Sequence, residues 1–124
     1  ALYFGSGERN IGIGYLAGIG LDGSDNVIIG NSANSADQSN TVVVGSGALV
    51  SSAGGTAIGR SARVNINAPG AIAIGEDSRA TAPNTVSFGT TTAQRRLVNV
   101  AAGSSSTDAI NFGQLDAVQT QVTS

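Results

Sequence analysis

The segment Val27-Ile28-Ile29-Gly30-Asn31-Ser32-Ala33 contains the pattern that decides the fold: a short apolar run, a glycine, and a small residue three positions later. The pattern recurs along the chain. Its glycines lie 16, 15, 14, 16 and 14 residues apart, at Gly14, Gly30, Gly45, Gly59, Gly75 and Gly89. A repeat of this length predicts an all-β solenoid, in which each repeat forms one coil and stacks on the next.

Each of these glycines follows three residues that suit a β-strand, at 11–13, 27–29, 42–44, 56–58, 72–74 and 86–88. The residues one and three positions before the glycine point to one side of the strand, because side chains alternate. The middle residue is mostly apolar too, so the strand is predicted to be buried on both faces. The polar remainder of each repeat suits a turn, a second solvent-facing strand and a return turn.

A coil of 14 to 16 residues is thin, since about 3.3 Å per residue leaves room for two short strands and two turns. Such a coil has little interior in which to bury the middle residue of each strand. We therefore predict that these residues pack against other copies of the chain in an obligate oligomer. The predicted interface positions in the strands are Ile28, Val43, Ala57 and Ala73.

The composition argues against most enzyme classes. The 124 residues include no cysteine and no histidine, and the six basic residues, all arginine, stand against eight acidic ones. Thiol nucleophiles, disulfides, histidine bases and most zinc sites are thereby removed. A net charge of −2 disfavours nucleic-acid binding. We predict a non-catalytic chain with no cofactor, no metal site and no membrane-spanning segment.

Two local patterns resemble binding motifs. Gly18, Gly20 and Gly23 have the spacing of a dinucleotide-binding loop, but the sequence after them leads into a β segment and not a helix. Asp22, Asp25 and Asn26 are oxygen ligands of the kind that calcium prefers, but no bidentate glutamate follows. We interpret both patterns as solvated turns between coils.

After Ala93 the repeat ends, and residues 94–115 read QRRLVNVAAGSSSTDAINFGQL. This stretch closely resembles the neck of trimeric autotransporter adhesins, bacterial surface proteins typified by the Yersinia adhesin. The repeats before it are similar to the head motif of that family, in which an apolar strand ends in Ala-Ile-Gly, as at residues 57–59 and 73–75. Phe112 and Gly113 depart from the family's usual small or aliphatic pair before Gln-Leu.

The resemblance implies a homotrimer of left-handed parallel β-rolls. It assigns about six coils of 14–16 residues to a head over residues 1–93, a neck to 94–114, and the start of a trimeric coiled-coil stalk to 115–124. It also implies neck residues that tie subunits together, which are Arg95, Arg96, Asn99, Asp108, Asn111, Gln114 and Leu115.

The implied function is multivalent adhesion at the bacterial cell surface. The expected partners are two further copies of the chain and a protein or glycan of the host cell surface or extracellular matrix. We expect a fragment exposed on the outer membrane, without membrane contact of its own and anchored through a C-terminal region outside these residues.

The residues after the repeats support a helix independently of the resemblance. Thr107-Asp108 is a helix N-cap signal, so we predict that a helix begins there. Leu115, Val118 and Val122 follow at the spacing of a coiled-coil seam and are predicted interface residues. The alternative is a single helix that caps a monomeric solenoid.

Arg95 and Arg96 form the one adjacent basic pair, and we predict that they pair with Asp108 between subunits. The alternative is ordinary surface charge.

Three other functions remain for comparison. Left-handed β-helix acyltransferases share the aliphatic-Gly pattern, but their triangular coils need about 18 residues and their chemistry a histidine. An ice-binding solenoid needs a regular threonine array, whereas Thr90, Thr91 and Thr92 occur in one coil only. A structural spacer is the third. The expected exposed and variable features are Tyr3, Phe4, Tyr15, the 21–26 loop and the 64–69 turn.

Overall fold

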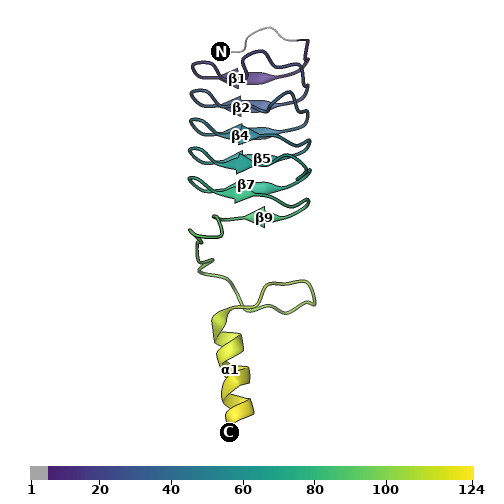
Figure 1. Cartoon of the computed structure of the whole chain (residues 1–124). Coiled ribbons are helices and arrows are strands. Elements are labelled where there is room, and N and C mark those ends of the chain that lie inside the picture. The colour runs from purple at the N-terminus through teal and green to yellow at the C-terminus, as the bar shows by residue number, and fades with distance from the viewer. Residues whose placement is uncertain (1–5) are drawn as a thin grey trace.

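The computed structural model describes residues 6–124, which form a stack of flat coils, an extended neck and a C-terminal helix (Figure 1). The predicted Tyr3 and Phe4 features lie outside the described residues. The elements are β1 (Ile11–Ile13), β2 (Val27–Ile29), β3 (Val42–Val44), β4 (Leu49–Val50), β5 (Thr56–Ile58), β6 (Arg63–Val64), β7 (Ile72–Ile74), β8 (Arg79–Ala80), β9 (Val86–Ser87) and α1 (Phe112–Thr123).

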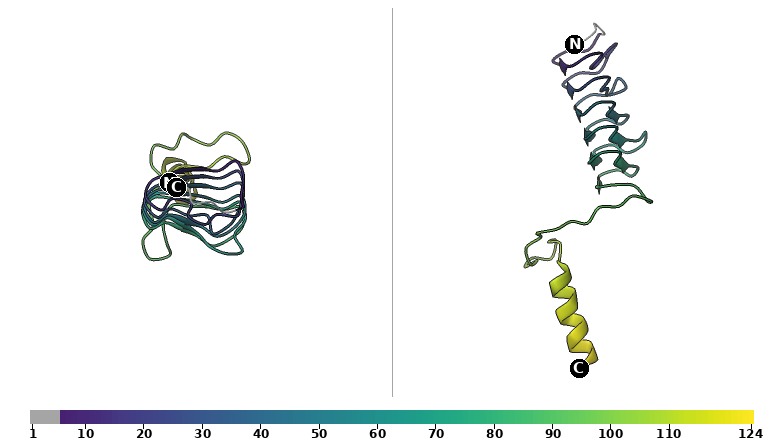
Figure 2. Two further views of the ribbon diagram at one scale, coloured as in Figure 1. Left: turned by 90° about the horizontal axis from the view of Figure 1, so that it is seen from above. Right: turned by 90° about the vertical axis from the view of Figure 1, so that its left-hand side faces the viewer.

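Two parallel sheets make up the stack. The predicted apolar segments form a six-stranded sheet in the order β1-β2-β3-β5-β7-β9, which spans about five turns of the solenoid. The predicted second strand exists in three coils, where β4, β6 and β8 form a second sheet. Equivalent residues of successive repeats are register partners, as with Ile28 and Val43. Seen from the side, the two sheets form the opposite layers of a slab (Figure 2).

The interior of the slab overturns our interface prediction for the strands. Ile28, Val43, Ala57 and Ala73 are completely buried within their own subunit, so they offer no surface to another copy. The second sheet supplies the partner that we expected to be missing. Its inward side chains, which are Val50, Val64 and Ala80, are also buried in the same hydrophobic core.

Small residues close the core at the corner that follows β1, β2, β3, β5 and β7. Three residues after the glycine of each of these repeats stands a fully buried small residue, namely Ala17, Ala33, Ala48, Ala62 or Ser78. The corner glycines need to be glycine on two counts. Gly45 has a φ of +138°, and a Cβ atom there would lie 2.4 Å from the Gly59 carbonyl oxygen of the next coil.

The first coils are held together by polar side chains as well as by backbone bonds. The buried side chain of Asn26 accepts hydrogen bonds from the Thr41 backbone N–H at 2.9 Å and from the Thr41 hydroxyl at 2.6 Å. Its amide nitrogen donates to the side chain of Asn10 at 3.0 Å and to the Gln38 carbonyl at 2.8 Å. These bonds join three successive coils from the inside.

The C-terminal helix begins later than we predicted. α1 starts at Phe112 with Asn111 as its N-cap, and a capping box links Asn111 and Gln114. Asp108 instead closes a preceding turn, where its carboxylate accepts the backbone N–H groups of Ser104 and Ser105, each at 3.0 Å. At Asn111 and at Asp108 alike, a polar side chain accepts hydrogen bonds from free backbone N–H groups. The signal at Thr107-Asp108 therefore marks a turn and not the helix start.

The predicted exposed features are only partly exposed. Tyr15 and Ile66 project into solvent. The ends of the two expected loops do not, because Leu21 and Asn26 are buried at one and Val64 and Ala68 at the other. These loops are therefore parts of the coils, with their ends turned inward, although Ile66 in the second loop is exposed.

Candidate functional site

The outward face of the six-stranded sheet is a continuous column of β-branched side chains. It carries the residues one and three positions before each glycine, and these alternate with the buried middle residues. Several of its members are 36% to 57% exposed, namely Ile11, Ile13, Val42, Ile58, Ile74 and Val86. A contiguous apolar surface of this kind marks an interaction site. We call this surface the apolar face.

Our sequence reasoning missed these residues, although the sequence contains a signal that identifies them. The middle position includes Gly12, Ala57, Ala73 and Ser87, whereas the two flanking positions are bulky in nearly every repeat. A thin coil has space inside only for small side chains, so residue size distinguishes the inward position from the outward ones.

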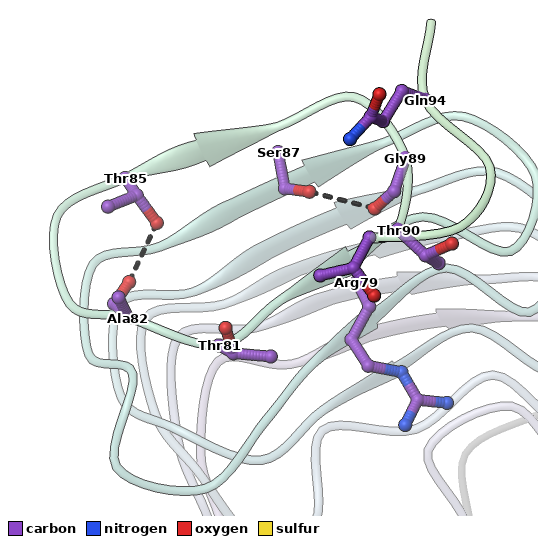
Figure 3. A pocket seen from close by; sticks show the side chains of 9 residues that line it. Arg79, Thr81, Ala82, Thr85, Ser87, Gly89, Thr90 and Gln94 are labelled. Carbon is purple, nitrogen blue, oxygen red and sulfur yellow. Dashed lines mark hydrogen bonds between the residues drawn. The ribbon is translucent and has the colours of Figure 1, made fainter.

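The other side of the slab has a different character. Its outward residues on the second sheet are Leu49, Arg63 and Arg79, which are aligned by the parallel register. At the end of the stack, a pocket of about 390 Å³ opens inside the last coil, next to Arg79 (Figure 3). Five hydroxyl-bearing residues contribute to its lining, which comprises Arg79, Thr81, Ala82, Thr85, Ser87, Gly89, Thr90, Thr91 and Gln94.

Arg95 closes one corner of the stack where the next coil would otherwise begin. Its guanidinium donates to the Ser78 hydroxyl at 2.9 Å and to the carbonyls of Phe88 and Glu76, each at 2.8 Å. A Cβ atom on Gly75 would meet this guanidinium at 2.8 Å, whereas at the earlier corner glycines it would meet the backbone of the following coil. The guanidinium therefore occupies the place of a further glycine.

The predicted neck residues Asn111 and Gln114 form a network at the start of α1. The Gln114 side chain accepts from the backbone N–H groups of Gly103 and Asn111, at 3.0 and 3.1 Å, and donates to the Gly103 carbonyl at 3.0 Å. The Asn111 side chain donates to the Val100 carbonyl at 3.0 Å. These bonds fix the neck loop to the helix within one chain.

The remaining predicted neck residues do not enter this side-chain network among the described residues. Within the described chain, neither Arg95 nor Arg96 forms an ion pair with Asp108. The bonds from Ser104 and Ser105 hold the pKa of the Asp108 carboxyl below its ordinary value. Asn99 occupies a left-handed turn position with a φ of +61°.

The neck and the helix expose apolar side chains that no other part of the described structure covers. A cavity of about 580 Å³ lies between residues 96–100 and 109–113. Around it Leu97, Val98 and Ile110 are more than 60% exposed. On α1 no side chain is buried, and the predicted seam residues are exposed as well, namely Leu115, Val118 and Val122. An exposed 12-residue helix is marginal in water by itself.

Comparison with known proteins reveals relatives of both parts of the chain. A family model described as the coiled stalk of trimeric autotransporter adhesin matches residues 96–124. The crystal structure of the collagen-binding domain of Yersinia adhesin YadA superposes with a TM-score of 0.77 at 31% sequence identity, and the match covers 94% of this chain and 70% of that one. This chain belongs to the trimeric autotransporter adhesins.

A longer member of the family matches as well. Autotransporter adhesin EhaG of Escherichia coli O157:H7 is 32% identical over 117 residues, which make up 94% of this chain. The chain spans 6% of the length of EhaG. The relatives of this trimeric autotransporter adhesin segment thus include a protein of far greater length.

The structure also separates this family from the acyltransferase and calcium-binding alternatives. The coils have two sheets and not the three sides of a triangular acyltransferase coil. The residues weighed as calcium ligands serve the stack, since Asp22 accepts from the Ser6 N–H at 2.7 Å and Asp25 pairs with Arg9 at 2.6 Å. Within residues 6–124, no helix combines the length and apolar character needed to cross a bilayer.

Proposed function

We propose that this chain is the head, neck and first stalk turns of a homotrimeric adhesin that attaches bacteria to host surfaces without catalysis. Residues 1–93 are the head, 94–114 the neck and 115–124 the start of the stalk. The observation that carries the proposal is the apolar face, which runs along the whole six-stranded sheet and is not covered by any of the residues 6–124. Three copies that turn this face inward remove it from water.

Two further surfaces support a trimer. Leu115, Val118 and Val122 follow at spacings of three and four on an otherwise polar helix, as in a coiled-coil seam. In the neck, exposed Arg96 is the arginine that remains for pairing with Asp108 of a neighbouring subunit, because Arg95 is bound to its own last coil.

The attachment target is a component of the extracellular matrix or host cell surface. Collagen is the first matrix protein to test, because the similar Yersinia structure is titled as a collagen-binding domain. Three identical heads per molecule and many molecules per cell turn weak contacts into firm attachment. By family, the site of action is the outer surface of a bacterial outer membrane.

The trimer is tested by light scattering coupled to size exclusion. We expect a mass near three chains, and near one chain for the double variant Val42→Asp/Ile58→Asp, which places carboxylates on the apolar face. The control is Ile66→Asp, an exposed apolar residue on a turn away from this face, which keeps the trimer. A monomeric wild-type chain would refute the proposal.

Adhesion is tested with immobilised collagen and a panel of other matrix proteins. We expect retention of the trimer and much weaker retention of the double variant, because single heads lose multivalency. If the trimer forms and no surface retains it, the spacer becomes the better account. The spacer is considered because this chain spans only 6% of the length of EhaG.

A further inference from the structure

The second sheet carries two arginines that the fold itself does not use. Arg63 and Arg79 are direct register partners on β6 and β8, and both side chains are exposed. In a parallel sheet their Cα atoms lie about 4.8 Å apart. Like charges directly opposite each other destabilise a sheet. The pair therefore has a cost within the isolated subunit that an anion bound between the two guanidiniums would remove.

The other arginines, unlike this pair, mostly have partners within the chain. Arg9 pairs with Glu8 and Asp25, and Arg60 pairs with Glu76. Among the ion pairs of the described residues, none includes Arg63 or Arg79. The pair is thus available for a partner outside the subunit.

Six of the eight acidic residues are remote in sequence from β6 and β8. Four of the eight are confined to residues 8–37, and two more occupy the neck and helix. Glu76 and Asp77 stand in the turn before β8, where both carboxylates raise the pKa of Arg60 and Glu76 also forms a hydrogen bond with it. The net charge of −2 therefore hides a local positive surface on the second sheet.

Polar groups that can bind sugar hydroxyls lie next to Arg79. Thr81 follows directly after β8, two residues beyond Arg79, and is exposed. Thr81 and Arg79 both border the hydroxyl-rich pocket at the end of the stack. Figure 3 shows the Arg79 side chain running away from Ser87 and Thr85, and the residue is exposed.

We propose that Arg63 and Arg79 form a binding site for an acidic linear polysaccharide, in which the two guanidiniums bind sulfate or carboxylate groups while Thr81 and the adjoining pocket bind sugar hydroxyls. The planar donor fork of arginine matches such oxyanions in bidentate geometry. A protein partner fits less well, because this face lacks the aromatic anchors that dominate protein interfaces. The site lies on the opposite layer from the apolar face and stays open in the proposed trimer.

This inference rests on the proposed function only for the source of the ligand at a host surface. The probe is heparin, a sulfated polysaccharide, with neutral dextran as the uncharged comparison. We expect the trimer to bind heparin in low salt, to release it as salt rises, and to ignore dextran. Absence of heparin binding by the wild-type trimer would overturn the proposal.

The decisive variant is Arg63→Gln/Arg79→Gln, for which we expect heparin affinity to fall at least about tenfold. Its matched control is Arg9→Gln/Arg60→Gln, which removes the same charge from arginines that are already paired. We expect the control to stay within about threefold of wild type, since its arginines are already neutralised. An equal loss of heparin affinity in the two double variants would show that only net charge matters and would refute the site.

Two more arms separate the ligand class from the adhesion proposal. Arg63→Lys/Arg79→Lys keeps the charge without the fork and should restore part of the affinity. Stronger binding of polyglutamate than of heparin would refute a polysaccharide ligand. A trimer that adheres to matrix proteins but not to heparin refutes this site alone, whereas one that binds heparin but no matrix or cell surface refutes adhesion alone.

Discussion

The first and last coils of the head reach the same backbone geometry by different means. In the N-terminal coils, residues 6–41, side chains such as Asn26 and Asp22 bridge from coil to coil. In the C-terminal coils, residues 42–89, a second sheet and the alkyl side chains of Val50 and Val64 replace most of these bridges. The period of the repeat therefore determines the backbone geometry, whereas the side chains that fill the space between the two layers can be polar or apolar.

The left-handed turn before each strand of the six-stranded sheet shows the same contrast. Its residue is Arg9, Asp25 and then Asn40 in the first coils, with φ near +60°, and Gly54 and Gly70 before β5 and β7, whereas Asn84 before β9 again has a φ of +55°. A left-handed conformation costs an ordinary residue about 1–2 kcal/mol, which glycine avoids. The first coils accept this cost where the side chains pair with each other, as Arg9 and Asp25 do.

The sharpest test places a charge in the core of the C-terminal coils. Val64→Asp should lower the free energy of unfolding by more than about 4 kcal/mol, because nothing there can pair with the carboxylate. Urea denaturation at fixed protein concentration measures the change. Ile66→Asp, two residues away and exposed, should stay within about 0.5 kcal/mol of wild type. A mild effect at Val64 would mean that the second sheet is loosely packed.

The corner glycines test whether the stack is tighter in its middle than at its end. Gly45→Ala should cost about 3 kcal/mol, since φ is unfavourable and the new Cβ meets the backbone of the next coil. Gly75→Ala should cost less, because its Cβ meets the flexible side chain of Arg95. Thermal unfolding of the two variants ranks them, and the reverse order would contradict the role given to Arg95.

A third test removes the polar bridge of the N-terminal coils. Asn26→Ala leaves the Thr41 N–H and hydroxyl buried without an acceptor and should cost about 2 kcal/mol. Hydrogen exchange should increase at residues 10–41 and remain unchanged around β6 and β8. Asn31→Ala, at an exposed position, serves as the control. Uniform loss of protection along the head would show that the two regions do not differ in this way.

The smallest expected effect is a pH dependence of the first coils. The hydrogen bond from Arg9 lowers the pKa of Asp25 in the folded chain. This stabilisation is therefore present above the ordinary aspartate pKa of about 3.9 and disappears as the pH falls through the lower folded value. Hydrogen exchange in the first coil should rise slightly in acid. Arg9→Gln should abolish the difference, and a rise unchanged by that substitution would assign the effect to other carboxylates.

The sequence predicts the six-stranded sheet almost residue by residue, because apolar triplets and corner glycines recur at equivalent positions. It predicts the neck as well, through the resemblance of residues 94–115. It misleads about which side of the strand is inside, since hydrophobicity alone does not distinguish Val43 from Val42. Small residues at the position of Val43 in other repeats, such as Ala57, contain that information.

The polar bridges were missed for another reason. The residue directly before each strand is polar in the first three coils, as at Asn10, Asn26 and Thr41, and small in the next two. Polarity at this position looks like an ordinary turn until the register shows that equivalent residues stack on one another. The start of α1 was displaced because Asp108 caps a turn that also presents free N–H groups.

Arg95 has a consequence for the solubility of the whole molecule. The last strand of any repeating sheet exposes unpaired backbone groups, and such an edge invites a strand from another molecule to add to it. One hydrogen bond of Arg95 goes to the Phe88 carbonyl, directly after the edge strand β9, so this acceptor is not free to pair with an added strand. Arg95 therefore protects one end of this exposed edge against the addition of a further strand.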